Sequence, residues 1–235
     1  MNASHYEQIG IAMTCRGFEE YRLMFDLSDG DLKAGPVLDV AAGGSSFTAD
    51  ARARGLEAFA VDPRYVGDAA GWVREAREEI AVSTAKLEVL REKFDWSYYG
   101  NVNRHRQGRE QSLDRFAAHM ADPSGRQAYI AGQLPELPFG DRQFALVLSS
   151  HFLFLYAEQF GFDFHRASLL ELIRICKPGG QIRIYPLLSL RWDPYPRLEE
   201  LLETVREAGC RAELRPSRLP FIPGSHRFVQ IVRMA

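Results

Sequence analysis

A strand–loop–strand pattern near the N-terminus constrains the fold of this chain more than any other feature. An apolar run over residues 37–40 leads into a loop of small residues over 41–46, and a second apolar run over 58–61 ends at Asp62. Two such strands joined by one short helix are typical of nucleotide-binding α/β units. The pattern predicts a parallel sheet with a ligand site at the carboxyl ends of its first two strands.

The rest of the chain continues the alternation of strands and helices. We expect strands over 128–131, 144–149, 181–185, 210–215 and 227–233, and helices over 164–176 and 197–208. The last two strands have no clear helix between them, which predicts an antiparallel edge pair. The expected fold is α/β: one domain over 1–235 with a doubly wound, mostly parallel seven-stranded sheet and an antiparallel C-terminal edge strand.

Two helical regions interrupt this alternation. Helical spacing over 6–29 predicts an N-terminal helical lead-in within residues 1–35. Residues 66–127 are mostly helical in pattern, and a single crossover helix needs far fewer residues. We therefore expect a helical insertion between strands two and three, with its second helix over 111–120 and the cluster Arg104–Arg109 before that helix.

Composition limits the class of protein and of partner. The 235 residues carry a net charge of −2, which favours neither nucleic acid nor a membrane surface. The chain has no apolar run of the ~20 residues that span a bilayer, and its first residues lack the pattern of a signal peptide. Cys15, Cys176 and Cys210 are scattered, which predicts reduced thiols in a cytoplasmic protein and neither a disulfide framework nor a metal site.

The loop after the first strand distinguishes between adenosyl ligands. NAD-binding loops have the pattern G-x-G-x-x-G, which no alignment of residues 41–47 supplies. Asp39, near the end of the first strand, would repel a pyrophosphate but attract a ligand that carries an ammonium and a sulfonium. Asp62, at the end of the second strand, suits the two hydroxyls of a ribose. The pair of acids favours S-adenosylmethionine.

Four segments occur in the order found in one enzyme family: residues 37–43 (Val-Leu-Asp-Val-Ala-Ala-Gly), Val61-Asp62, residues 137–150, and residues 173–180 ending in Lys-Pro-Gly-Gly. With them the chain resembles the class I, Rossmann-like S-adenosylmethionine-dependent methyltransferases over roughly residues 36–235. The resemblance implies S-adenosylmethionine as cofactor and S-adenosylhomocysteine as product. It implies cofactor contacts from Asp39, Ala41, Ala42, Gly43, Asp62, Pro63, Gln133, Leu134 and Ser149.

The chain departs from the family pattern at the loop. Ala41, Gly43 and Ser45 stand at the three usual glycine positions, and Gln133 replaces an acid near the adenine. An alanine at position 41 is tolerated if its φ stays negative. Gln133 still offers a donor and an acceptor to a base edge.

The resemblance implies methyl transfer to an O or N nucleophile, with a small molecule as the preferred acceptor. The lead-in and the insertion would form the lid and the acceptor pocket. His151, just after the fourth strand, is the candidate base, with packing as its alternative. Arg16 is expected to be solvated and Tyr21 to be buried in the core.

Two other functions stay open. The fold could serve a catalytically inactive binding protein, since the loop is altered. An RNA or protein methyltransferase could dock its substrate on Arg104, Arg106 and Arg109, although a solvated loop face is the preferred interpretation of that cluster. Nucleic acid is not favoured as a partner, because the chain has neither an Asn-Pro-Pro-Tyr segment nor a Pro-Cys pair after strand four.

Overall fold

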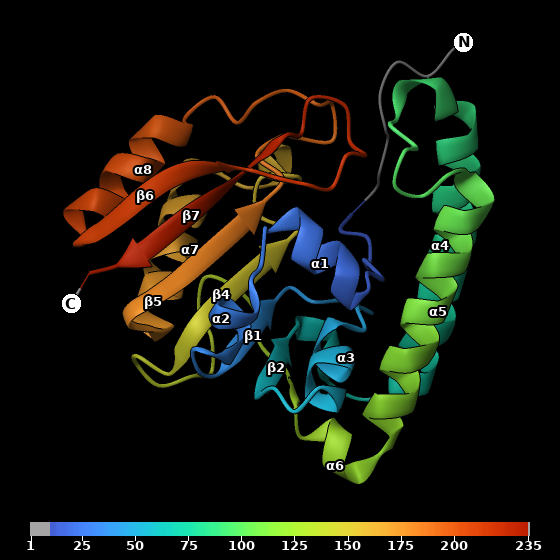
Figure 1. The fold of residues 1–235 in the computed structure, drawn as a ribbon, viewed down its shortest axis with the longest axis horizontal. Helices are drawn as coiled ribbons and strands as arrows, with labels where there is room; N and C mark the ends of the chain where they lie inside the picture. Colours follow the sequence, from blue (N-terminus) through green and yellow to red (C-terminus); the bar gives the residue numbers. More distant parts are fainter. Residues whose placement is uncertain (1–9, 235) are drawn as a thin grey trace.

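A mixed sheet in the order β3-β2-β1-β4-β5-β7-β6 forms the centre of the molecule (Figure 1). The structure, a computed structural model, describes residues 10–234. The strands are β1 (Val37–Val40), β2 (Ala58–Val61), β3 (Tyr129–Ile130), β4 (Phe144–Ser150), β5 (Cys176–Tyr185), β6 (Cys210–Pro216) and β7 (Arg227–Arg233). Strands β1 to β5 are parallel, while β7 runs antiparallel to β5 and β6. This confirms the expected fold class, with β7 one place inside the edge strand β6.

Helices cover both faces of the sheet. They are α1 (Phe18–Met24), α2 (Asp29–Lys33), α3 (Phe47–Ala53), α4 (Ala69–Val89), α5 (Val102–Ala121), α6 (Pro123–Arg126), α7 (Phe162–Ile175) and α8 (Leu198–Glu207), with short 3₁₀ turns at Pro63–Tyr65, Arg91–Lys93 and Ala157–Gln159. Successive side chains of β4 point to opposite faces. Leu146 and Leu148 therefore pack with α1 and α3, whereas Val147 packs with α7 and α8.

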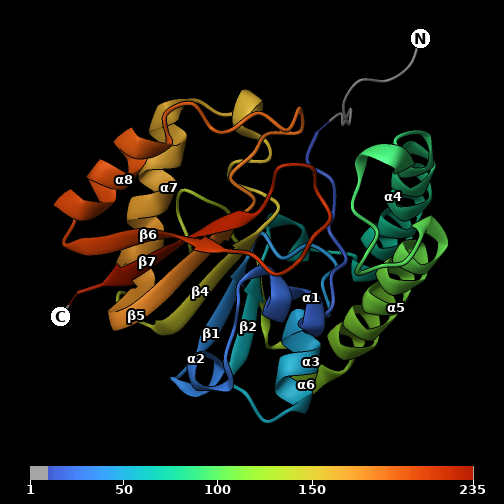
Figure 2. The ribbon, with the colours of Figure 1, turned by 45° about the horizontal axis from the view of Figure 1, so that its top comes forward.

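Helices α4 and α5 form the insertion between β2 and β3 as a long hairpin (Figures 1 and 2). Trp72 of α4 contacts Phe116 of α5, with ring centroids 4.9 Å apart. Helix α5 begins nine residues before the expected start. The reason is an N-cap: the Asn101 side chain accepts a hydrogen bond from the Arg104 N–H at 2.9 Å. The Arg104–Arg109 cluster thus lies on a helix, which corrects the expected loop.

The lead-in differs most from its expectation. Residues 10–17, here called the N-terminal strap, form no helix and cross the loop after β1. The Gly44 N–H donates to the Thr14 carbonyl at 3.0 Å, and the Ser46 N–H donates to the Arg16 carbonyl at 3.1 Å. The first helix begins only at Phe18, because the periodic apolar residues all follow Gly17. Residues 6–9 of the expected helix lie outside the described residues.

Within residues 10–234, no helix is both long and apolar enough for a membrane crossing.

Candidate functional site

Two cavities adjoin each other at the carboxyl ends of β1, β2 and β4. The large cavity, about 490 Å³, is lined by residues from the loops after these strands and by strap residues 10–14. The small cavity, about 130 Å³, lies between the strap, the α4–α5 hairpin and the loops that precede α8 and β7. Residues 12–14 and His151 line both cavities. The two cavities therefore adjoin along residues 12–14, here called the shared wall, which borders both without closing one off from the other at His151.

Asp62 lies at the edge of the large cavity, directly after β2. One carboxylate oxygen accepts the Gly43 N–H and the other accepts the Arg64 N–H, each at 3.0 Å. Burial raises the pKa of this carboxyl, although the two amides oppose that shift. Asp62 thus fixes the loop after β1 and also lines the cavity.

The strands end in strained backbone where they meet the cavity. Ala41 follows β1 with φ 56°, and His151 follows β4 with φ 55°. Left-handed backbone is uncommon for residues with a Cβ and is concentrated at functional sites. The condition of a negative φ at Ala41 is therefore not met, since the turn after β1 adopts the left-handed region despite the added methyl.

Gly43 and Gly44 are needed for contact with the strap. A Cβ built on Gly43 lies 3.0 Å from the Thr14 carbonyl oxygen. On Gly44 it lies 2.9 Å from the Cys15 Sγ and equally close to a methyl of Leu113 on α5. The small residues of this loop thus admit the protein's own backbone and the hairpin.

Asp39 is not among the residues that line the two cavities, and its expected contact with a ligand stays a prediction. Its side chain is fully buried, and one oxygen accepts the Tyr21 hydroxyl at 2.9 Å. Its other oxygen has no hydrogen-bond partner among the described residues. Burial raises the pKa of Asp39 well above its usual range, with the nearby Asp62 adding to the shift. Asp39 thus connects β1 to α1 through Tyr21, and Tyr21 is a core residue as expected.

The other predicted cofactor residues divide into two groups. Pro63, Gln133 and Leu134 line the large cavity together with Ala41, Gly43 and Asp62. Ala42 and Ser149 are buried and do not line it.

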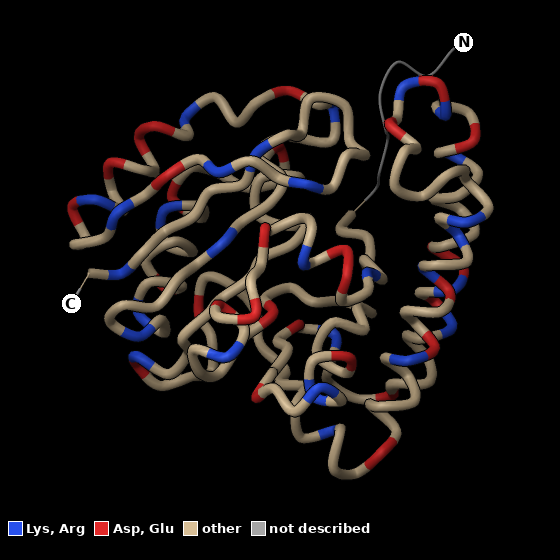
Figure 3. Tube along the Cα trace, viewed as in Figure 1, with Lys and Arg blue, Asp and Glu red and all other residues tan. Residues whose placement is uncertain are grey.

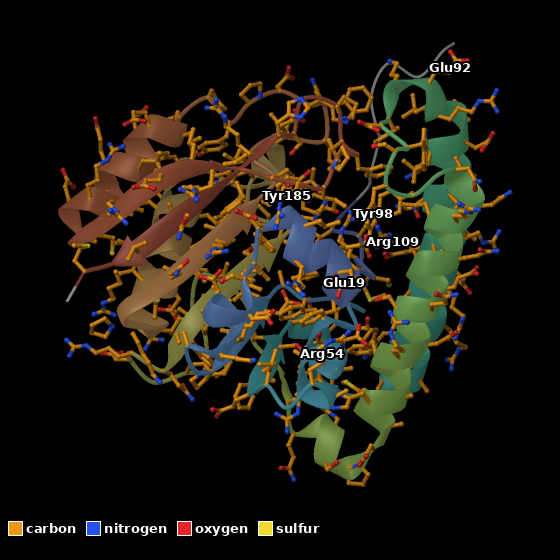
Figure 4. The ribbon with its side chains drawn as sticks, viewed as in Figure 1. Glu19, Arg54, Glu92, Tyr98, Arg109 and Tyr185 are labelled. Carbon is orange, nitrogen blue, oxygen red and sulfur yellow. The ribbon has the colours of Figure 1, made fainter. Side chains whose placement is uncertain are left out.

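The small cavity has a buried ion-pair network along one side. Arg109 of α5 donates to both carboxylate oxygens of Glu20 on α1, at 2.9 and 2.6 Å, and Figure 4 shows it between these helices. It also donates to the Cys15 carbonyl and to the Tyr99 hydroxyl, each at 2.8 Å. Burial by itself raises the pKa of Glu20, but the charges of Arg109 and Arg16 lower it to about 2. The predicted solvated faces of Arg16 and Arg109 are therefore wrong.

Arg104 and Arg106 have the solvated position that was expected for the whole cluster. Both are exposed on α5, and Arg106 pairs with Glu110 of the same helix at 2.8 Å. Figure 3 shows basic and acidic residues intermixed along α4 and α5. The hairpin therefore presents a mixed-charge surface.

His151 is neutral at physiological pH. Burial lowers its pKa well below the usual value, and the charges of Arg16 and Arg109 lower it further. Its Nδ1 lies 2.9 Å from the Ser150 Oγ, and its backbone N–H donates to the Tyr185 carbonyl at 2.6 Å. A neutral imidazole between two cavities can accept a proton from a ligand in either one.

The sequence did not predict that Glu20 and the strap, which are distant in the chain from the other site residues, contribute to the site. Glu20 was not considered, and nothing in the spacing placed the strap over the loop. A sequence signal existed for one pair: His105 and Arg109 are four apart and share a helix face once Asn101 is read as an N-cap.

A scan against models of known protein families finds no match. The chain is 28% identical over 219 residues to an uncharacterized protein of Methanocaldococcus jannaschii, covering 93% of this chain and 94% of that protein.

Three solved structures illustrate the similar folds. One is a TehB-like SAM-dependent methyltransferase from Corynebacterium glutamicum, at 15% identity and TM-score 0.49, covering 93% of this chain and 88% of that one. Another is the 1,6-didemethyltoxoflavin-N1-methyltransferase of Burkholderia thailandensis with bound S-adenosylhomocysteine. It is 16% identical with a TM-score of 0.44, and the match covers 85% of this chain and 71% of that one. The third is the magnesium protoporphyrin IX methyltransferase of Synechocystis with bound SAM. It is 15% identical with a TM-score of 0.46, and the match covers 87% of this chain and 73% of that one. The strand order β3-β2-β1-β4-β5-β7-β6 is that of a doubly wound, mostly parallel sheet with an antiparallel C-terminal pair, which is the architecture that the sequence resemblance implied.

Proposed function

We propose that this protein transfers a methyl group from S-adenosylmethionine to an O or N nucleophile of a small molecule. One observation carries the proposal: a ligand-sized cavity at the ends of β1, β2 and β4 contains Asp62 and shares His151 with a second cavity. In open α/β sheets ligands bind at this point, where the strand order reverses.

The residues of the large cavity fit S-adenosylmethionine. Its volume of about 490 Å³ lies within the roughly 300–1,000 Å³ of small-molecule sites. Asp62 would accept the ribose hydroxyls, and Gln133 and Leu134 would contact the adenine. Ala41, Gly43 and the strap would enclose the amino-acid end. When bound, S-adenosylmethionine supplies an electrophilic methyl group.

The chain's own residues would then act mainly by position. The shared wall and His151 would hold the acceptor beside the large cavity, and buried surroundings would exclude water. Correct placement of two reactants can supply about 7–11 kcal/mol of the barrier. His151, kept neutral by burial and by the nearby arginines, would take a proton from a protonated acceptor.

The mixed charge of the hairpin supports a small molecule over RNA as the acceptor. Binding of a polyanion needs clustered basic side chains. Arg106 is paired with Glu110, and Arg109 is buried against Glu20.

Calorimetric titration with S-adenosylmethionine and S-adenosylhomocysteine tests the proposal. We expect both to bind, and Asp62→Asn to weaken binding about ten- to a hundredfold, because charged hydrogen bonds contribute about 1.5–3 kcal/mol. Asp68→Asn is the matched control, because Asp68 is exposed and only caps α4. Circular dichroism confirms that each variant is folded.

Two results would contradict the proposal. Absence of heat with both nucleosides would favour an inactive binding protein. Equal affinity of Asp62→Asn and the natural protein would remove Asp62 from the cofactor site.

A further inference from the structure

The small cavity has features that specify the acceptor class. We propose that it takes a planar organic acid with one ring, whose carboxylate pairs with Arg16 while its nucleophile faces His151. The proposal deepens the proposed function and rests on it for the transfer step. Its binding part, an acid held beside Arg16, stands on the cavity alone.

The size of the cavity matches a single ring. Its volume is about 130 Å³, and a protein cavity of about 150 Å³ accommodates benzene. A fused ring system or a long chain would exceed this space. Ligands of the cavity should therefore present one ring to its interior.

Aromatic side chains form one side of the cavity. Phe94 stacks on Phe221 with centroids 4.8 Å apart, and the imidazole of His105 stacks on the same ring at 5.0 Å. Trp192 meets Phe94 edge-on at 5.7 Å. All four residues line the cavity. Flat rings in stacked and edge-on arrangements favour a flat aromatic ligand.

The charge of the cavity is unbalanced. Glu20 neutralises one arginine, Arg109, through two short contacts. Arg16 is a second cation on the same side and reaches Glu20 only at 3.4 Å. His105 is neutral, because burial lowers its pKa well below the usual value. The thiol of Cys15 is neutral as well, because burial raises its pKa to about 12. Glu79 accepts the Met13 N–H of the strap at 2.6 Å and is paired with Arg64 at 3.7 Å. With these pairs counted, one positive charge remains beside the cavity.

Arg16 also has an unused donor. Only 7% of the residue is exposed, and its Nε has no hydrogen-bond partner among the described residues. The Nδ1 of His105, another residue that lines the cavity, is also without a partner there. A buried donor without an acceptor is unfavourable, and a carboxylate would satisfy the planar guanidinium well. A ligand with one negative charge would balance the charge of Arg16 and would accept a hydrogen bond from its Nε.

The positions of Arg16 and His151 orient such a ligand. Both line the small cavity, but only His151 also lines the large one. With its carboxylate at Arg16, the acid would present its nucleophile toward His151. In the transfer, an oxygen or nitrogen lone pair of the acid forms the new bond to the methyl carbon, and the carbon–sulfur bond breaks with its electron pair left on sulfur. The acceptor's proton passes to His151, and S-adenosylhomocysteine is the neutral thioether product.

Calorimetric competition between acids and their amides tests the inference without any turnover. The ligands are benzoate and 4-hydroxybenzoate, each compared with its carboxamide at equal concentration. We expect the acids to bind the natural protein at least tenfold more tightly. Arg16→Gln should abolish this preference, and Arg16→Lys should retain part of it, because lysine keeps the charge without the planar donors.

Arg106→Gln is the matched control, since Arg106 is exposed on α5 and pairs with Glu110 there. It should leave the acid preference unchanged. Phe221→Leu should weaken acid and amide alike, because it alters the ring contacts and leaves Arg16 in place.

The outcomes separate this inference from the proposed function. If S-adenosylhomocysteine binds but acids and amides bind equally, or neither binds at 10 mM, the inference is overturned and the proposed function stands. If S-adenosylhomocysteine fails to bind while acids are preferred through Arg16, the proposed function fails and the acid site stands. If Arg16→Gln does not fold, the acid–amide ratio of the natural protein and of Arg16→Lys decides.

Discussion

Asp39 and Asp62 follow neighbouring strands of the same sheet, but they have different environments. Asp62 accepts two loop amides at the cavity edge, whereas Asp39 is enclosed beneath Tyr21. The sequence predicted the strand positions of both residues and the cavity role proposed for Asp62. It could not predict the burial of Asp39, because that depends on a tyrosine 18 positions earlier.

At the residue scale, Asp39→Asn tests the raised pKa of Asp39. The pKa of Asp39 in the folded protein lies well above its value in the unfolded chain. The natural folded protein therefore becomes less stable relative to the unfolded chain as pH rises above about 4. Asparagine can still accept the Tyr21 hydroxyl and needs no proton. We expect the unfolding free energy of Asp39→Asn relative to the natural protein to increase by at least about 1 kcal/mol from pH 4 to pH 8.

Urea denaturation at several pH values measures this difference. The exposed Asp29→Asn is the control and should change stability little at any pH. A difference for Asp39→Asn that stays constant with pH would mean that Asp39 is ionised in the folded protein.

At the scale of elements, strands were easier to predict than helices. The runs over 37–40 and 58–61 and the final strand agree with β1, β2 and β7, because buried strands leave continuous apolar signals. Helix α5 began too late in the prediction, since its first half is charged and its buried face includes His105 and Arg109. Charged residues that pair in the interior resemble a solvated surface in sequence.

The contact between α1 and α5 depends on Glu20. At pH 7 we expect Glu20→Gln to lower the unfolding free energy by about 3–5 kcal/mol, because it leaves the Arg109 charge buried and unpaired. The adjacent, exposed Glu19→Gln should change it by less than about 0.5 kcal/mol. The pKa of Glu20 is lowered to about 2, so its stabilisation is present above the unfolded value near 4.5 and is lost as pH falls toward 2.

Guanidinium denaturation between pH 2 and pH 7 checks both parts. Glu20→Gln should lack this component of the acid destabilisation. A similar cost for the two glutamine variants would argue against a structural ion pair between α1 and α5.

Two glycines provide a contrast between the strap and the hairpin. Gly44→Ala brings a methyl against Cys15 and Leu113, and overpacking of this kind costs about 1–3 kcal/mol. Gly108→Ala, inside α5 with no neighbour within 4 Å, should stabilise by about 0.5–1 kcal/mol.

Thermal unfolding of both alanine variants is monitored by circular dichroism. We expect a lower melting temperature for Gly44→Ala and a higher one for Gly108→Ala than for the natural protein. Calorimetry with S-adenosylhomocysteine should show weaker binding for Gly44→Ala alone, since only that change displaces the strap. An undisturbed melting temperature for Gly44→Ala would indicate that residues 13–15 do not pack on the loop in solution.

At the scale of the whole molecule, the candidate site combines segments that lie far apart in sequence. The sheet supplies the floor of the large cavity, and its doubly wound, mostly parallel architecture was predicted from the alternation of strands and helices. The strap and the hairpin supply the other sides. Their packing depends on contacts such as that of Arg109 with Cys15, 94 residues apart, for which local patterns carry no information.

The shared wall of residues 12–14 has a thermodynamic consequence. One thin stretch of backbone belongs to two compartments, so any ligand that moves it outward from one side narrows the other. The free energy of such coupling is reciprocal: whatever the first molecule does to the affinity of the second, the second does to the first by the same factor. A ligand that displaced residues 12–14 from one cavity would therefore change the affinity of the other cavity for its own ligand, with no rearrangement of the sheet.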